Sequence, residues 1–287
     1  MIEVMYSSKN VIHKTDISKK PSDTLAWINA FNLGNRDLDI LSKKLGVSRY
    51  IIKHFLDNME ISRLEKYNAY DVIILKALVE KKTKTLGIVK SKDYVLTTCP
   101  ENININLDKD SFSKDSDHLL KSILNQIIKN FSTRLDKLEE SIDYLENITF
   151  DEKIDNDPKQ IFHLKKELIY IKKALNANKE TISEMKGFED INLEFHQMMD
   201  IENTLSSRIT SVMEIYMTFS SNKLNEIIKS FTVIASLLLI PTIISGIYGM
   251  NVILPLGDVE GSFFIILGIM LIFMALTALY FKFKKWI

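Results

Sequence analysis

Two long uncharged apolar segments near the C-terminal end constrain the fold of this sequence more than any other feature. Neither Phe231 to Tyr248 nor Ser262 to Phe281 contains Asp, Glu, Lys or Arg. A helix of 18 or more such residues spans roughly 27–30 Å, about the thickness of the hydrocarbon core of a bilayer. The segments exclude an ordinary soluble domain and predict a membrane protein with two spans. A cleavable secretion signal would lie at the opposite end, and residues 1–20 lack the apolar core that one requires.

Composition excludes several functional classes. The 287 residues include 37 basic and 37 acidic side chains, and this zero net charge argues against a nucleic-acid-binding chain. The single cysteine, Cys99, excludes a disulfide scaffold and a cysteine-built zinc site. The five histidines are scattered without metal-ligand spacing, and no phosphate-binding glycine loop occurs. We therefore expect neither an enzyme nor an ATP-driven pump.

The distribution of lysines predicts the orientation in the membrane. The connector between the spans, residues 249–261, has no lysine or arginine, whereas lysines precede the first span and follow the second: Lys223, Lys229, Lys282, Lys284 and Lys285. Positively charged flanks remain on the cytoplasmic side. Both termini are therefore expected in the cytoplasm, and the connector is expected on the outer side of the membrane.

The residues before the spans predict an α+β cytoplasmic domain followed by long stalk helices. Strands are expected over residues 2–6, 10–13, 71–79, 84–89 and 93–99, and helices over 36–45 and 48–58. Longer helices are expected over 115–145 and 158–185, and from residue 190 into the first span. The resulting division is 1–110 for the α/β domain, 111–189 for a long-helix pair, 190–251 for the stalk and first span, 252–261 for the outer loop, 262–281 for the second span and 282–287 for a basic tail.

A short motif at the outer end of the first span resembles a known family. The sequence there is Tyr248-Gly249-Met250-Asn251, preceded by Pro241 and Gly246. Together with the paired C-terminal spans, it resembles the CorA family of divalent cation channels, whose signature is a Gly-Met-Asn tripeptide. The resemblance includes residues 213–216, 221–225 and the tail 281–287, and it is looser in the N-terminal domain, at Trp27-Ile28.

The resemblance implies a homopentamer in which the first spans line a pore and the second spans face membrane lipid. Steps of three or four residues along the first span give a neutral stripe: Asn225, Ile228, Thr232, Ala235, Leu239, Thr242, Gly246 and Gly249. Because Mg²⁺ dehydrates reluctantly, a wide pore lined by neutral oxygens suits its hydrated form. Gly249, Met250 and Asn251 would form the selectivity mouth. The other interpretation of the stripe is a small-residue face for helix association in the membrane.

Further positions are assigned to conduction and regulation. Asp258 and Glu260 in the outer loop would attract cations, and Leu239 and Ile228 would gate the pore by excluding water. The resemblance implies that Glu214 forms an acidic ring at the cytoplasmic entrance. It also implies that cytosolic Mg²⁺ binds between protomers, where Asp200 would join a second site and the first site would be formed by Asp190 and Glu80. The turn carrying this last residue, Glu80-Lys81-Lys82-Thr83-Lys84, holds three lysines, which indicates that this regulation is altered or absent.

Three other interpretations fit parts of the sequence. A membrane-anchored coiled coil with a tethering role would explain the stalk and spans, but not the tripeptide. Transport of Co²⁺, Ni²⁺ or Zn²⁺ is the second; the stripe has no Cys or His to select a softer ion, although hydrated Co²⁺ or Ni²⁺ would still pass. Residues 39–57 look like a DNA-binding helix-turn-helix, but an αα-hairpin packed on a sheet explains them without a basic cluster.

Overall fold

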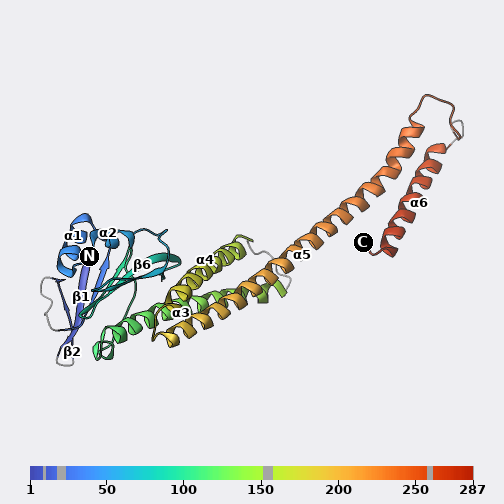
Figure 1. Ribbon diagram of the computed structural model, residues 1–287. Coiled ribbons are helices and arrows are strands. Elements are labelled where there is room, and N and C mark those ends of the chain that lie inside the picture. The colour runs from blue at the N-terminus through green and yellow to red at the C-terminus, as the bar shows by residue number, and fades with distance from the viewer. Residues whose placement is uncertain (9–10, 18–23, 151–157, 257–260, 287) are drawn as a thin grey trace. The chain divides into compact units, whose positions relative to one another are not determined.

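The computed structural model describes residues 1–8, 11–17, 24–150, 158–256 and 261–286. These residues form two compact units, Met1–Met213 and Glu214–Ile287. The boundary between the units lies inside one 60-residue helix, α5 (Glu189–Tyr248) (Figure 1).

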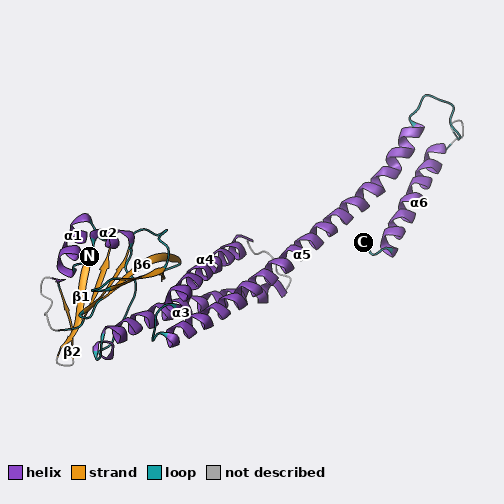
Figure 2. Cartoon of the chain, viewed as in Figure 1, coloured by secondary structure: helices purple, strands orange, loops and turns teal. Residues whose placement is uncertain are grey.

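A seven-stranded sheet forms the centre of the N-terminal unit (Figure 2). Its order is β2-β1-β3-β7-β6-β5-β4, and every neighbouring pair is antiparallel except β3 and β7. The strands are β1 (Ile2–Ser8), β2 (Val11–Thr15), β3 (Ala26–Phe31), β4 (Arg63–Lys66), β5 (Asp71–Val79), β6 (Lys82–Lys90) and β7 (Tyr94–Cys99). The expected strands are confirmed, although residue 10 lies outside the described residues. Two strands, β3 and β4, were not predicted.

One face of the sheet is covered by the short helices α1 (Asn35–Leu45) and α2 (Arg49–His54). Leu41, Ile52 and Phe55 are fully buried in one cluster with apolar side chains of the sheet. Gly46 ends α1 with a left-handed backbone, φ 68°, as a C-terminal glycine commonly does. The αα-hairpin interpretation is therefore confirmed, because the apolar faces of α1 and α2 bind the sheet.

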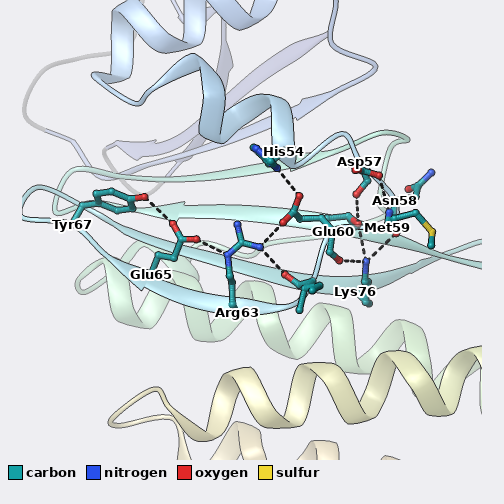
Figure 3. Close-up of polar contacts among 11 residues, drawn as sticks. His54, Asp57, Asn58, Met59, Glu60, Arg63, Glu65, Tyr67 and Lys76 are labelled. Atoms are coloured by element: carbon teal, nitrogen blue, oxygen red, sulfur yellow. Dashed lines mark hydrogen bonds and ion pairs between the residues drawn. The ribbon is translucent and has the colours of Figure 1, made fainter.

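The second helix is shorter than the predicted 48–58, because tertiary contacts hold the following residues in a loop. The ammonium group of Lys76 on β5 donates to the carbonyl oxygens of Asn58 at 3.0 Å and Glu60 at 2.6 Å (Figure 3). Thr85 Oγ1 donates to the carbonyl of Asp57 at 2.7 Å. Burial lowers the pKa of Lys76. These bonds satisfy carbonyls that would otherwise continue the helix ladder.

The edge strand β4 is held by a row of charged and polar side chains (Figure 3). Arg63 forms ion pairs with Glu60 and Glu65, and Glu65 accepts a hydrogen bond from the Tyr67 hydroxyl at 2.8 Å. His54 Nδ1 lies 2.6 Å from Glu60 Oε2. The hydrogen bond from Arg63 contributes most to lowering the pKa of Glu60. Charged side chains on an edge strand also oppose pairing with a strand of another molecule.

The opposite face of the sheet contacts two long helices, α3 (Ser116–Phe150) and α4 (Pro158–Ser183). A short 3₁₀ turn, η2 (Asp110–Phe112), precedes α3, and the Asp115 carboxylate accepts the His118 N–H at 2.9 Å at the start of the helix. The predicted helices are confirmed, including the start of α4 at Pro158.

Asn178 of α4 acts as a substitute for a missing strand. β4 pairs with β5 only as far as Ile74, so the backbone of Lys76 is free on that side. The fully buried Asn178 side chain accepts the Lys76 N–H and donates to the Lys76 carbonyl, both at 2.7 Å. This amide thereby joins α4 to the sheet with two hydrogen bonds.

Replacing Asn178 with leucine is expected to destabilise the N-terminal unit by about 2–4 kcal/mol, because two backbone groups lose their partners in a buried position. Thermal denaturation of the full-length protein in detergent, followed by circular dichroism, measures this loss. Asn176→Leu is the matched control, since the Asn176 side chain is partly exposed and has no hydrogen bond to the described residues. Equal melting temperatures for the two variants would show that the two hydrogen bonds of Asn178 do not stabilise the N-terminal unit.

The first turns of α5 belong to the N-terminal unit and lie against α3 and α4. Arg208 forms ion pairs with three carboxylates of α3: Glu139 at 3.4 Å, Glu146 at 2.5 Å, and Asp143. Hydrogen bonds to Glu146 and Asp143 raise the pKa of the Arg208 guanidinium. Gly187, with φ 83°, precedes α5, in agreement with the predicted interruption there.

Candidate functional site

The second unit contains the two helices that are long and apolar enough to cross a membrane. They are the C-terminal part of α5 and all of α6 (Ser262–Phe283). α5 continues through Pro241, which has no N–H, so the Leu237 carbonyl loses its usual helical donor. Both predicted spans therefore lie on helices, and α5 carries the stripe proposed from the sequence.

The covered face of α5 is formed by Val233, Leu237, Ile240, Ile244 and Tyr248, and Val233 is only 6% exposed. On α6, the covered positions recur at similar spacing: Ile266, Met270, Met274, Ala278 and Phe281. Among the described residues of this unit, α6 is the only other helix, and it lies alongside α5 (Figure 1). These two faces therefore meet.

The stripe proposed from the sequence lies on the other side of α5. At about 100° per residue, its mean direction is roughly opposite to that of the face turned toward α6. All its members are exposed in the single chain: Asn225, Ile228, Thr232, Ala235, Leu239, Thr242, Gly246 and Gly249. The side of α5 away from α6 is therefore open to other copies of the chain or to a pore.

The two threonines of the stripe bond back to their own helix. Thr232 Oγ1 donates to the Ile228 carbonyl at 2.8 Å, and Thr242 Oγ1 donates to the Leu238 carbonyl at 2.7 Å. Each hydroxyl hydrogen is therefore engaged, and the oxygen lone pairs remain free to accept. A hydrated cation offers hydrogen-bond donors from its water molecules, so this arrangement suits such a ligand.

The Gly-Met-Asn tripeptide follows the end of α5 directly. Gly249 N–H donates to the Ser245 carbonyl at 2.9 Å, and Met250 N–H donates to the Ile247 carbonyl at 3.2 Å. The N–H of Met250 therefore misses the Gly246 carbonyl, its partner in a continued helix, and no described residue after the helix donates to that carbonyl. Asn251 is exposed. The Gly246 carbonyl and the exposed Asn251 amide thus lie near this end of the span. The selectivity mouth at Gly249, Met250 and Asn251 stays a prediction.

The structure says little about the acidic residues that were assigned to the two entrances of the pore. Glu214 is exposed at the first residue of the second unit. Asp258 and Glu260 lie outside the described residues. Their role in cation attraction remains a prediction.

The three proposed regulatory carboxylates are not gathered within one chain. Asp190 is bound by Lys121 of α3, whose Nζ lies 3.0 and 3.1 Å from the two carboxylate oxygens. These hydrogen bonds hold the pKa of Asp190 below its ordinary value. Asp200 lies ten residues further along α5, roughly 15 Å away, and Glu80 is exposed in the β5–β6 turn with φ 55°. The described part of a single chain holds no group of three metal-ligating side chains.

Lys121 was missed by the sequence analysis. It lies 69 residues from Asp190 in the chain, and nothing in its local sequence distinguishes it from the other lysines of α3. Only the position of α3 beside α5 brings this ammonium group to the carboxylate.

The architecture defines a class: a membrane protein with a large N-terminal α/β domain, a long helix and two C-terminal spans. Comparison with known sequences identifies the family. Residues 22–285 match the family described as "CorA-like Mg²⁺ transporter protein". The chain belongs to this family.

The relatives match over nearly the whole chain. The cobalt/magnesium transport protein CorA of Methanocaldococcus jannaschii is 29% identical, with 92% of each chain covered. The protein of the same name from Thermotoga maritima is 23% identical over 93% of this chain and 85% of its own. The complete structure of the M. jannaschii CorA magnesium transporter superposes with a TM-score of 0.83 at 27% identity, and covers 100% of this chain and 99% of that one. The predicted fold and membrane location are confirmed by these matches.

Proposed function

We propose that this chain is one subunit of a homopentameric channel that passes hydrated Mg²⁺ into the cytoplasm. The observation that carries the proposal is the exposed neutral stripe on α5, which lies opposite the face turned toward α6 and leads to Gly249, Met250 and Asn251. Five copies around an axis would bring five such stripes together and leave α6 outside, in contact with lipid. The family and its named relatives support Mg²⁺, with Co²⁺ as a second substrate.

In this proposal the residues have distinct roles along the path. Asn251 and the carbonyls near Gly249 hydrogen-bond the hydration shell at the mouth, while neutral groups from Thr242 down to Asn225 line the conduit. Such a lining need not strip water from the ion, which Mg²⁺ resists. The membrane potential supplies about 2.3 kcal/mol per elementary charge per 100 mV, or roughly twice that for a divalent ion, so passive influx needs no ATP. Glu214 would collect the ion at the cytoplasmic end.

Regulation by cytosolic Mg²⁺ would depend on contacts between subunits. Asp190, Asp200 and Glu80 would need partners from a neighbouring copy. At Asp190, an arriving Mg²⁺ would compete with Lys121 for the carboxylate, and at Glu80 it would approach Lys81 and Lys82. Both features weaken a cation site, so we propose that closure by cytosolic Mg²⁺ is weak in this protein.

The experiment that tests the channel proposal is Mg²⁺ uptake into proteoliposomes that contain the purified full-length protein. An inside-negative potential is imposed, and a Mg²⁺-sensitive dye reports entry. We expect uptake that increases with the potential, with Co²⁺ and Ni²⁺ as competing ions. A correctly assembled protein that admits none of these ions would favour the tethering alternative, and uptake of Zn²⁺ alone would favour the transporter of another metal.

Replacing Leu239 with asparagine is expected to raise the uptake rate several-fold, because a polar ring retains water where an apolar ring excludes it. The same proteoliposome assay measures the rate. Leu238→Asn makes the same change one position earlier, about 100° around the helix. The gate would have to lie elsewhere if the two variants gave equal rates.

A further inference from the structure

A wide groove in the N-terminal unit lies apart from the membrane spans. Its volume is about 1170 Å³, and three segments form its walls: the β5–β6 turn, the segment that follows β7, and one face of α3. Of the positions assigned to conduction or regulation, only Glu80 borders it. The proposed channel function leaves this groove without a role.

The α3 wall presents a polar face of the helix. Gln126, Lys129, Asn130, Thr133 and Lys137 line the groove at spacings of three or four residues. Lys129 and Lys137 are both exposed. They are eight positions apart in the sequence, which places them roughly 12 Å apart along the helix. A ligand that contacts both must therefore be extended.

Amide side chains form a second wall. In the segment after β7, Ile103 and Ile105 are buried, at 4% and 6% exposure, while Asn102, Asn104 and Asn106 are exposed and line the groove. This alternation anchors the segment through the isoleucines and turns the asparagines outward. Asn130 Nδ2 donates to the Asn104 carbonyl at 3.1 Å and joins this wall to α3.

The charges of the groove are unbalanced. Lys81 and Lys82 of the β5–β6 turn add two exposed ammonium groups to those of Lys129 and Lys137. None of the four has an ion pair with a described residue. The lining carboxylate of Glu101 is already paired with Lys84 at 2.6 Å, which leaves only Glu80 to offset them. Like charges that face one groove repel each other, and a bound anion would relieve this repulsion.

We propose that the groove binds the triphosphate chain of a metal-free nucleoside triphosphate or of inorganic triphosphate. Lysines on two walls and a span of roughly 12 Å fit an extended anion with several charges better than a single phosphate. The described lining contains no aromatic residue, so the phosphates, rather than a stacked base, carry the recognition. The exposed amides provide further donors along the chain.

Isothermal titration calorimetry of the full-length protein in detergent tests this proposal. Sodium triphosphate and ATP are titrated separately at low ionic strength, without divalent cations, because Mg²⁺ binds the same phosphate oxygens. We expect binding to the wild type and about tenfold weaker binding to the double variant Lys129→Gln/Lys137→Gln, which corresponds to the loss of two charge-assisted contacts. The control Lys43→Gln/Lys44→Gln removes two exposed lysines of α1 and should bind as the wild type does.

A comparison of the two ligands shows whether the groove recognises the phosphate chain alone or the nucleoside as well. Equal affinities would show that only the phosphate chain is read, whereas tighter binding of ATP would add the amides as contacts to the nucleoside. Absence of binding for both ligands, or an unchanged affinity in the groove variant, would overturn the proposal. Binding is measured without transport, so this result is independent of the channel proposal.

Discussion

Replacing Asn251 with alanine is expected to lower Mg²⁺ uptake by roughly a hundredfold or more. A ring of five subunits would lose five amides at the mouth at once. At about 0.5–1.5 kcal/mol for each hydrogen bond to the hydration shell, the summed loss is about 2.5–7.5 kcal/mol, and the roughly 2.8 kcal/mol that a hundredfold change requires lies at the lower end of this range. The proteoliposome assay with an imposed potential measures the effect.

The interpretation requires that the Asn251 variant still assembles. Size-exclusion chromatography in detergent compares its oligomer with that of the wild type. Asn222→Ala is the matched control, because Asn222 is an exposed asparagine of α5 that lies about 120° from the stripe. If the Asn251 variant assembled and took up Mg²⁺ at the wild-type rate, the tripeptide would not form the mouth of the pore.

Replacing Gly87 with alanine is expected to destabilise the N-terminal unit by about 3 kcal/mol or more. Gly87 lies in β6 directly beneath the Phe55 ring, and an added Cβ would overlap the ring carbons. Phe55 is fully buried, so the ring has no free space into which it can move. Overfilling a core commonly costs about 1–3 kcal/mol, and this overlap involves the ring directly. Thermal denaturation by circular dichroism measures the loss.

A second substitution tests the cause. Phe55→Ala alone is expected to cost about 3–5 kcal/mol by leaving a cavity. In Gly87→Ala/Phe55→Ala, the new methyl group enters space vacated by the ring, so the double variant should be more stable than the sum of the single effects predicts. Simple additivity would show that the glycine is not needed for this contact.

The helices were more predictable from the sequence than the strands. Apolar residues at helical spacing mark α3, α4 and α5, and Pro158 and Gly187 mark the breaks. β3 was missed because both of its faces are covered: five of its six residues are buried, so it shows no polar alternation. β4 was missed because its four residues, Arg-Leu-Glu-Lys, resemble a solvated loop.

The site was predictable only in part, for a physical reason. The stripe on α5 follows from helical geometry alone, and the position of α6 is consistent with it. The partners of Asp190 and Asn178 depend on how α3, α4 and β5 meet in space, over separations of 69 and 102 residues. The groove at Lys129 likewise needs three distant segments, which no local pattern records.

Pro241 gives the first span a point of reduced bending stiffness. The missing hydrogen bond would join the Leu237 carbonyl to residue 241, so the turn that contains Leu239 lacks one bond and the helix resists flexing least there. On the proposed channel, the outer segment with Thr242, Gly246 and the tripeptide would tilt as a short lever while the longer inner segment stays straight. The mouth of the pore could then widen or narrow without a change in the width of the lower conduit.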